Sequence, residues 1–151
     1  DKNGYVNDDD IVRYGIMARM IWSKGIEDFV ESSKIGYEKN PKTQFFLLGS
    51  PDHQSPDSVS YEWLSSLNKK YSHITWLEHQ DDVKEFLSMI DVFVLPTYYP
   101  EGLPKSLLEA GAMSLPLITT NTPGCKEVVQ DNFNGLIVNI KDQIDLAQKM
   151  Y

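Results

Sequence analysis

Residues 97–125 read TYYPEGLPKSLLEAGAMSLPLITTNTPGC, and this stretch predicts a loop, a helix and a strand in that order. An apolar run at 92–95 precedes it. Pro104 is favoured at the first helical position because its missing N–H would have no partner there, and Gly102 lets the backbone bend into the helix. We expect the helix at about 104–113 and the strand at 117–119. Such a unit aims unpaired backbone N–H groups at whatever lies above the preceding strand, which favours an anion.

Two glutamates lie in this unit, Glu101 in the loop and Glu109 on the helix. Glu109 is the only charged residue in 106–125, and its sequence neighbours are largely apolar. A carboxylate in such surroundings is costly to bury unless a ligand hydroxyl or a backbone N–H donates to it. The alternative is that Glu109 lies on the solvent face of an amphipathic helix. The spacing alone favours neither interpretation.

The rest of the chain alternates short apolar strands with helices. Strands are expected at 11–17, 44–48, 74–77, 92–95, 117–119 and 136–138, and helices at about 24–39, 59–71, 82–90, 104–113, 126–130 and from 142. This order predicts an α/β fold, a doubly wound parallel sheet of about six strands covered on both faces. Ligands bind such sheets at the carboxyl ends of the strands. The segments expected at that edge are Arg19, Ser50, 78–80, 98–105 and 121–125.

Length and composition limit the class of protein. The 151 residues suffice for one domain, with 10 residues at the start read as a linker or N-terminal tail and 11–151 as the domain. Residues 8–10 are aspartates with D-x-D spacing, which we interpret as a solvated run because no strand precedes them. The net charge of −8 argues against a free-standing nucleic-acid binder.

Three further features indicate a cytoplasmic protein. Cys125 is the only cysteine, so no disulfide forms within the chain, which fits a reducing compartment. No apolar run approaches the roughly 20 residues that span a bilayer. The first residues, DKNGYVNDDD, lack the pattern of a signal peptide.

An ordered series of motifs resembles the donor-site signature of retaining glycosyltransferase family 4, a GT-B type. The series is EGLPKSLLEA from Glu101, LPLITTN from Leu115 and PGCKEVV from Pro123. The signature of that family has two glutamates separated by seven residues. The resemblance covers the chain from Gly15 to about Val138, and it is strongest to enzymes of capsule, lipopolysaccharide and exopolysaccharide synthesis. It implies the C-terminal, Rossmann-like half of a two-domain enzyme, which binds a nucleotide-sugar.

The resemblance also implies roles for individual residues. Arg19 and Lys24, in GIMARMIWSKG, would bind the diphosphate of the donor and assist catalysis, since fixed cations stabilise a departing nucleotide diphosphate. Without the resemblance, both would be read as ordinary exposed side chains. Glu101 would be catalytic and bind hydroxyls of the transferred sugar, and Glu109 would bind the ribose hydroxyls.

The remaining implied contacts are to backbone and base. The backbone N–H groups of Gly102, Leu103 and Lys105 would face the sugar or phosphate, and the loop that contains His79 would adjoin the nucleotide base. Two prolines depart from the common pattern of the family. Pro104 has no N–H to offer, and Pro100 lies where relatives often have an arginine. The sugar preference therefore stays open.

No metal or cofactor is expected. The three histidines, His53, His73 and His79, have no metal-ligand spacing and are each interpreted as surface residues. Cys125 has no second cysteine or paired histidine, so we interpret it as part of a turn rather than as a nucleophile or ligand. The loop around it, 122–127, either lies near the donor sugar or serves only as a strand-to-helix turn. The three tryptophans are interpreted as packing residues.

The resemblance implies transfer of a sugar from a nucleotide diphosphate sugar, expected to be a UDP-sugar, to a growing glycan with retention at the anomeric carbon. The acceptor-binding N-terminal domain is expected to be absent, so the chain alone should transfer little sugar. The acceptor is expected to be lipid-linked, with peripheral association of the intact enzyme at the inner face of the cytoplasmic membrane.

Three alternatives are weighed against this function. A nucleotide-sugar epimerase of the same fold and a non-catalytic nucleotide-sugar-binding module both remain open. A phospho-receiver domain is disfavoured, because receivers need acidic residues after the first strand and an aspartate after the third. This chain has Ala18-Arg19 and Leu77-Glu78-His79 there.

Overall fold

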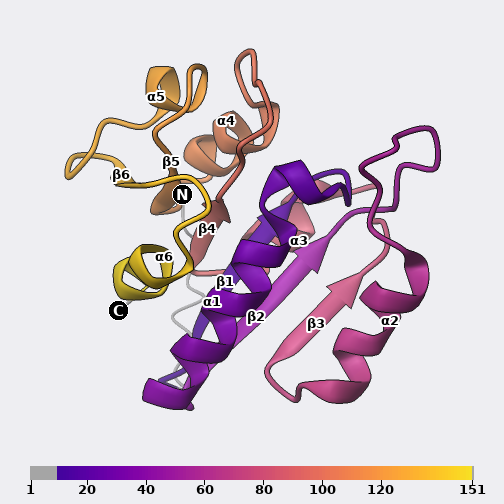
Figure 1. The fold of residues 1–151 in the computed structure, drawn as a ribbon. Coiled ribbons are helices and arrows are strands. Elements are labelled where there is room, and N and C mark those ends of the chain that lie inside the picture. The colour runs from indigo at the N-terminus through magenta and orange to yellow at the C-terminus, as the bar shows by residue number, and fades with distance from the viewer. Residues whose placement is uncertain (1–9, 151) are drawn as a thin grey trace.

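The computed structural model describes residues 10–150. The tail predicted at 1–10 and the aspartate run at 8–10 therefore lie outside the described residues, except for Asp10. Figure 1 shows a single sheet with helices on both of its faces. All five strand pairings are parallel, and the strand order is β3-β2-β1-β4-β5-β6. The predicted doubly wound α/β fold is confirmed.

The strands are β1 (Val12–Met17), β2 (Thr43–Leu48), β3 (Ile74–Leu77), β4 (Val92–Leu95), β5 (Leu117–Thr120) and β6 (Gly135–Val138). The helices are α1 (Ile26–Lys39), α2 (Tyr61–Lys70), α3 (Val83–Met89), α4 (Lys105–Ala112), α5 (Cys125–Val128) and α6 (Gln143–Lys149), with a short 3-10 helix, η1 (Trp22–Lys24), before α1. Each predicted element is present, and its ends agree with the prediction within about two residues, the usual uncertainty of helix ends.

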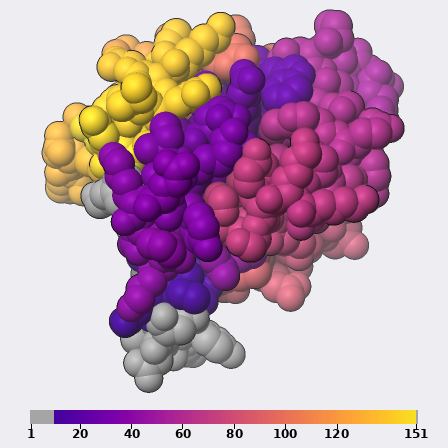
Figure 2. All heavy atoms as spheres, turned by 60° about the horizontal axis from the view of Figure 1, so that its bottom comes forward, coloured from indigo at the N-terminus to yellow at the C-terminus, as the bar shows by residue number. Residues whose placement is uncertain are grey.

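The helices divide between the two faces as right-handed crossovers require. α1 and α6 pack against each other, and α4 contacts α5 as well as β4 and β5 (Figure 1). Figure 2 shows the same adjacency on the surface, where the C-terminal segment lies beside α1. A Gln143 amide donates to Asp28 at 3.1 Å, and the Ser32 hydroxyl donates to the Gln143 carbonyl at 2.9 Å. These two hydrogen bonds hold the start of α6 against α1.

The core lies between the sheet and its helices. Four phenylalanines, Phe29, Phe45, Phe86 and Phe93, are at most 1% exposed. Trp22 packs edge-on against Trp63, and Trp76 is buried, as expected for packing residues. Within residues 10–150, none of the helices combines the length and the apolar character that a membrane crossing demands.

His73 corrects the interpretation of the histidines as surface residues. Its side chain is buried, and its ring stacks on Tyr37 with 4.0 Å between the centroids. Among the described residues its Nε2 has no hydrogen-bond partner. Burial lowers the pKa of the His73 imidazole. His73 directly precedes β3 and packs against the rings of Tyr37 and Tyr71 as an aromatic residue would.

Candidate functional site

Two cations lie at the carboxyl edge of the sheet, and each has a carboxylate partner. Lys24, at the end of η1, forms an ion pair with Glu101 from the loop after β4. Arg19, which follows β1, pairs with Asp52 at 2.7 Å from the loop after β2. The Lys24 and Glu101 side chains are 12% and 9% exposed, whereas Arg19 is 52% exposed. The Lys24–Glu101 ion pair is therefore mostly buried, whereas Arg19 of the other pair is exposed to solvent.

Tyr99 joins the two pairs. The Lys24 ammonium lies 4.6 Å from the centroid of its ring, and the Arg19 guanidinium carbon lies 5.6 Å from the same centroid. Cations are attracted to the negative faces of aromatic rings at such distances. Sequence reasoning named both cations and missed the tyrosine between them, because a loop tyrosine carries no pattern of its own.

Hydrogen bonds hold the loop after β4 onto η1. The Ser23 carbonyl accepts from the backbone N–H groups of Tyr98 and Tyr99, each at 2.9 Å. The hydroxyl of buried Thr97 lies 3.2 Å from that carbonyl oxygen and 3.2 Å from Glu101 Oε1. The turn that carries Lys24 and the loop that carries Glu101 are thus one fastened unit.

Two glycines make this close approach feasible. Gly25 has φ 81°, and a Cβ there would lie 2.1 Å from the carbonyl oxygen of Pro96. Gly124 has φ 84°, and a Cβ there would lie 1.8 Å from the carbonyl oxygen of Gly102. Only glycine tolerates that conformation and that contact together. The segment 122–127 therefore packs directly against the Glu101 loop. Cys125 is fully buried, and it is the first residue of α5 rather than part of the turn before it.

The structure corrects two details at the start of α4. Pro104 precedes the first helical residue, Lys105, rather than occupying it. Gly102 has no positive φ, and a Cβ there would meet nothing within 4 Å, so the backbone does not need glycine at this point. The side chains of Leu103 and Lys105 are exposed, at 62% and 87%.

The setting of Glu109 is intermediate between a buried carboxylate and a residue on the solvent face of the helix. Its side chain is 30% exposed, and its Oε1 lies 3.7 Å from Lys105 Nζ one helical turn earlier. The neighbouring Leu107 and Ala110 are buried. Glu109 is thus neither a buried carboxylate nor a freely solvated one, and it keeps oxygen atoms that face solvent.

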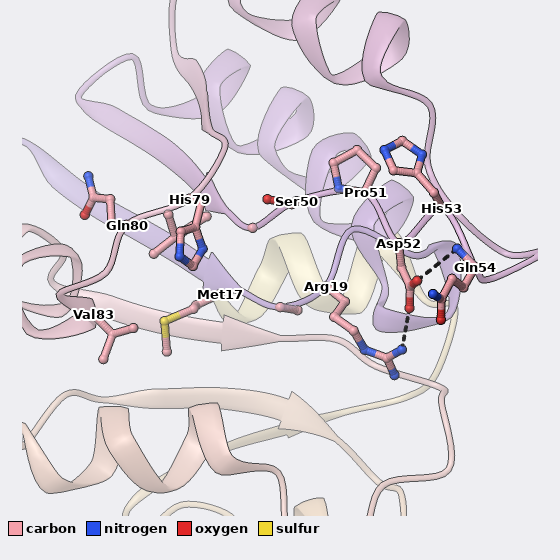
Figure 3. A pocket seen from close by; sticks show the side chains of 13 residues that line it. Met17, Arg19, Ser50, Pro51, Asp52, His53, Gln54, His79, Gln80 and Val83 are labelled. Atoms are coloured by element: carbon pink, nitrogen blue, oxygen red, sulfur yellow. Dashed lines mark hydrogen bonds and ion pairs between the residues drawn. The ribbon is translucent and has the colours of Figure 1, made fainter.

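A pocket of about 650 Å³ opens beside Arg19, at the ends of β1, β2 and β3. In Figure 3, Arg19 and Asp52 meet at one end of it, while His79, Gln80 and Val83 lie at the other. His79 is exposed, and its Nε2 lies 3.3 Å from Asp81. The Gln80 side-chain oxygen is buried and has no hydrogen-bond partner among the described residues. The pocket therefore has the Arg19 cation at one end and the loop of His79 and Gln80 at the other.

The ion pair of Arg19 and Asp52 shifts the pKa of both side chains. The Arg19 guanidinium holds the pKa of Asp52 below its usual range, and Asp52 raises the pKa of Arg19. Across residues 10–150, no three histidine, cysteine or acidic side chains cluster as a metal site would require. The chemistry that the edge offers is recognition of an anion by two positioned cations, next to carboxylates that accept hydrogen bonds from hydroxyls.

The predicted site residues thus fall into two groups. The structure brings Arg19, Lys24 and Glu101 together, with Gly102 packed on Gly124. His79 lines the same pocket as Arg19, whereas Leu103, Lys105 and Glu109 lie around the first turns of α4. Sequence reasoning also missed Asp52, which forms an ion pair with Arg19, and Thr97, whose hydroxyl donates to Glu101.

Comparison with known proteins gives a family and a set of relatives. The family model of glycosyl transferases group 1 matches residues 2–151. The chain is 33% identical over 135 residues to the N,N'-diacetylbacillosaminyl-diphospho-undecaprenol alpha-1,3-N-acetylgalactosaminyltransferase of Campylobacter jejuni, with 89% of this chain and 33% of the relative covered. It is 30% identical over 116 residues to the UDP-Gal:alpha-D-GlcNAc-diphosphoundecaprenol alpha-1,3-galactosyltransferase of Escherichia coli, with 76% and 29% covered.

Solved structures share the fold. Anabaena Alr3699/HepE in complex with UDP superposes with a TM-score of 0.80 at 18% identity, over 92% of this chain and 38% of that one. The C-terminal domain of LpcC from Francisella tularensis superposes with a TM-score of 0.77 at 22% identity, over 92% and 73%. The chain spans about a third of the length of the curated relatives it matches.

Proposed function

Because the chain belongs to the group 1 glycosyl transferases, we propose that it is the donor-binding half of a GT-B enzyme that transfers a sugar from a nucleotide diphosphate sugar to a growing glycan. The single observation that supports this most is the pair of cations, Arg19 and Lys24, on one tyrosine ring at the carboxyl edge of the sheet. A diphosphate needs compensating charge there, and its charge grows as the sugar departs.

The nucleoside is proposed to lie in the pocket beside Arg19. The base would lie near the loop that contains His79 and Gln80, both of which line the pocket. The name of the Escherichia coli relative specifies a UDP-sugar, and HepE has been solved with UDP. UDP is therefore the nucleotide proposed for this chain.

The carboxylates would recognise hydroxyl groups. Glu101, beside Lys24, is proposed to accept from hydroxyls of the sugar, and Glu109, which is partly exposed on α4, from the ribose. Backbone N–H groups of Gly102, Leu103 and Lys105 at the start of α4 would face the sugar or phosphate, because the first amides of a helix lack intrahelical acceptors. No metal or cofactor enters this proposal.

The reaction proposed for the intact protein breaks the bond between the anomeric carbon and the diphosphate, and joins that carbon to an acceptor hydroxyl with retention of configuration. The hydroxyl proton leaves with UDP as the other product. A second domain is proposed to bind the acceptor. The names of two relatives specify diphospho-undecaprenol acceptors, so the acceptor is proposed to be lipid-linked at the inner face of the cytoplasmic membrane.

The test is product analysis with the intact protein. It should be incubated with a panel of UDP-sugars and an undecaprenyl-diphosphate-linked sugar, and the products followed by mass spectrometry and by the NMR coupling of the new anomeric proton. A lengthened lipid-linked glycan with the donor's anomeric configuration is expected. An isomerised nucleotide-sugar in place of a lengthened glycan would identify an epimerase, and binding without any product would indicate a non-catalytic module.

A further inference from the structure

In the structure, the positive charge of Lys24 is already neutralised by Glu101, although a diphosphate would need it. Lys24 is assigned above to the donor's phosphate and Glu101 to the donor's sugar, yet in the structure they neutralise each other. Both side chains are largely withdrawn from water, at 12% and 9% exposed. An ion pair in such a setting is weakly screened, so each partner depends on the other.

Glu101 has few alternatives to Lys24. Among residues 10–150 its hydrogen-bond donors are the Lys24 ammonium and the Thr97 hydroxyl. If Lys24 turns to a phosphate, Glu101 keeps only a hydroxyl that the Ser23 carbonyl also attracts. A carboxylate left in that position without a cation raises the free energy of the complex.

We infer that Glu101 is an internal counter-ion that competes with the diphosphate for Lys24, so that nucleotide binding is an exchange of partners. This inference rests on the proposed function and adds a specificity role to it. A sugar-carrying nucleotide supplies sugar hydroxyls that replace the ammonium on Glu101, whereas the only hydroxyl donors of bare UDP are those of its ribose, which are proposed to bind Glu109. Glu101 therefore selects for donor over the UDP product.

Neutralising Glu101 should therefore strengthen UDP binding, although Glu101 belongs to the binding site. Glu101→Gln keeps an oxygen that accepts from Thr97 and Lys24 but removes the charge that holds Lys24. We expect this variant to bind UDP about tenfold more tightly than the wild-type chain in calorimetric titration, which is the effect of one partly screened unit charge at short range. The matched control is Glu38→Gln, which removes the same charge. Glu38 is exposed and lies in the last turn of α1, just before β2 begins, at the opposite edge of the sheet.

Each result of the UDP titration either supports or overturns the exchange of partners. A tenfold gain in Glu101→Gln with no change in Glu38→Gln supports the exchange. Equal or weaker UDP binding by Glu101→Gln, or the same gain in both variants, overturns it and leaves the proposed function standing. No UDP binding by wild type or variant overturns both.

A second measurement needs no variant, should Glu101→Gln fail to fold. In a crystal of the wild-type chain with UDP, Lys24 Nζ should lie within about 3.2 Å of a phosphate oxygen, at hydrogen-bond distance, and no longer contact Glu101. Lys24 still paired with Glu101 in that complex would overturn the exchange.

Discussion

His73 illustrates how a single residue in this chain takes its properties from its neighbours. Its imidazole stacks on Tyr37, and Phe45 and Tyr71 meet it edge-on. Because the ring is buried among aromatic groups and Nε2 lacks a partner among the described residues, the charged form is disfavoured. The folded chain therefore takes up a proton at His73 at a lower pH than the unfolded chain does.

This shift predicts how stability depends on pH. Below the unfolded pKa of about 6.5, and down to the lower folded pKa, unfolding takes up a proton, so the free energy of unfolding falls as pH falls. The slope from one group is at most about 1.4 kcal/mol per pH unit. We expect His73→Phe to flatten this part of the profile, measured by urea denaturation between about pH 7.5 and pH 5. An unchanged slope in His73→Phe would contradict the assignment.

At the same scale, sequence reasoning found the charged members of the site and missed their arrangement. Arg19, Lys24 and Glu101 were identified through a family pattern, which assigns roles to residues one by one. That Lys24 and Glu101 pair, and that Tyr99 lies against both cations, depends on side-chain directions in two loops 77 positions apart in sequence. No local pattern encodes such a contact.

Among the elements, the loop between β5 and α5 supports the Glu101 loop through a backbone contact. Its Gly124 lies against the backbone of the Glu101 loop in a left-handed conformation. The neighbouring Gly102 has neither restriction. Sequence reasoning assigned the conformational need to Gly102, because that glycine precedes a helix, and it overlooked Gly124, whose need arises from a contact between separate loops.

The two glycines therefore form a matched pair of substitutions. Gly124→Ala should lower the free energy of unfolding by at least about 1–3 kcal/mol, since the conformation is strained for alanine and its Cβ would overlap the Gly102 carbonyl. Gly102→Ala should change it by less than about 0.5 kcal/mol. Urea denaturation of both variants measures the difference. Equal losses in the two variants would mean that Gly124 does not support the Glu101 loop as described.

In the molecule as a whole, the fold could be predicted almost completely from sequence, because each strand is a short apolar run and each helix has its own boundary residues. Parallel pairing then brings all the strand ends to one edge. The partners of the two cations could not be predicted, since Asp52 and Thr97 belong to loops with no periodicity. The parallel strand order predicts the edge at which a ligand binds, whereas the loops after the strands determine which charged side chains would contact the ligand.

The central claim is that this edge binds UDP, and a thermal-shift titration of the chain with UDP, GDP and ADP tests it most directly. A ligand that binds only the folded state stabilises it by about 2.7 kcal/mol at one hundred times its dissociation constant. We predict that UDP raises the melting temperature more than GDP or ADP does, and that Arg19→Ala and Glu109→Ala each abolish the difference. Small, equal shifts for all three nucleotides, unchanged by either substitution, would contradict the claim.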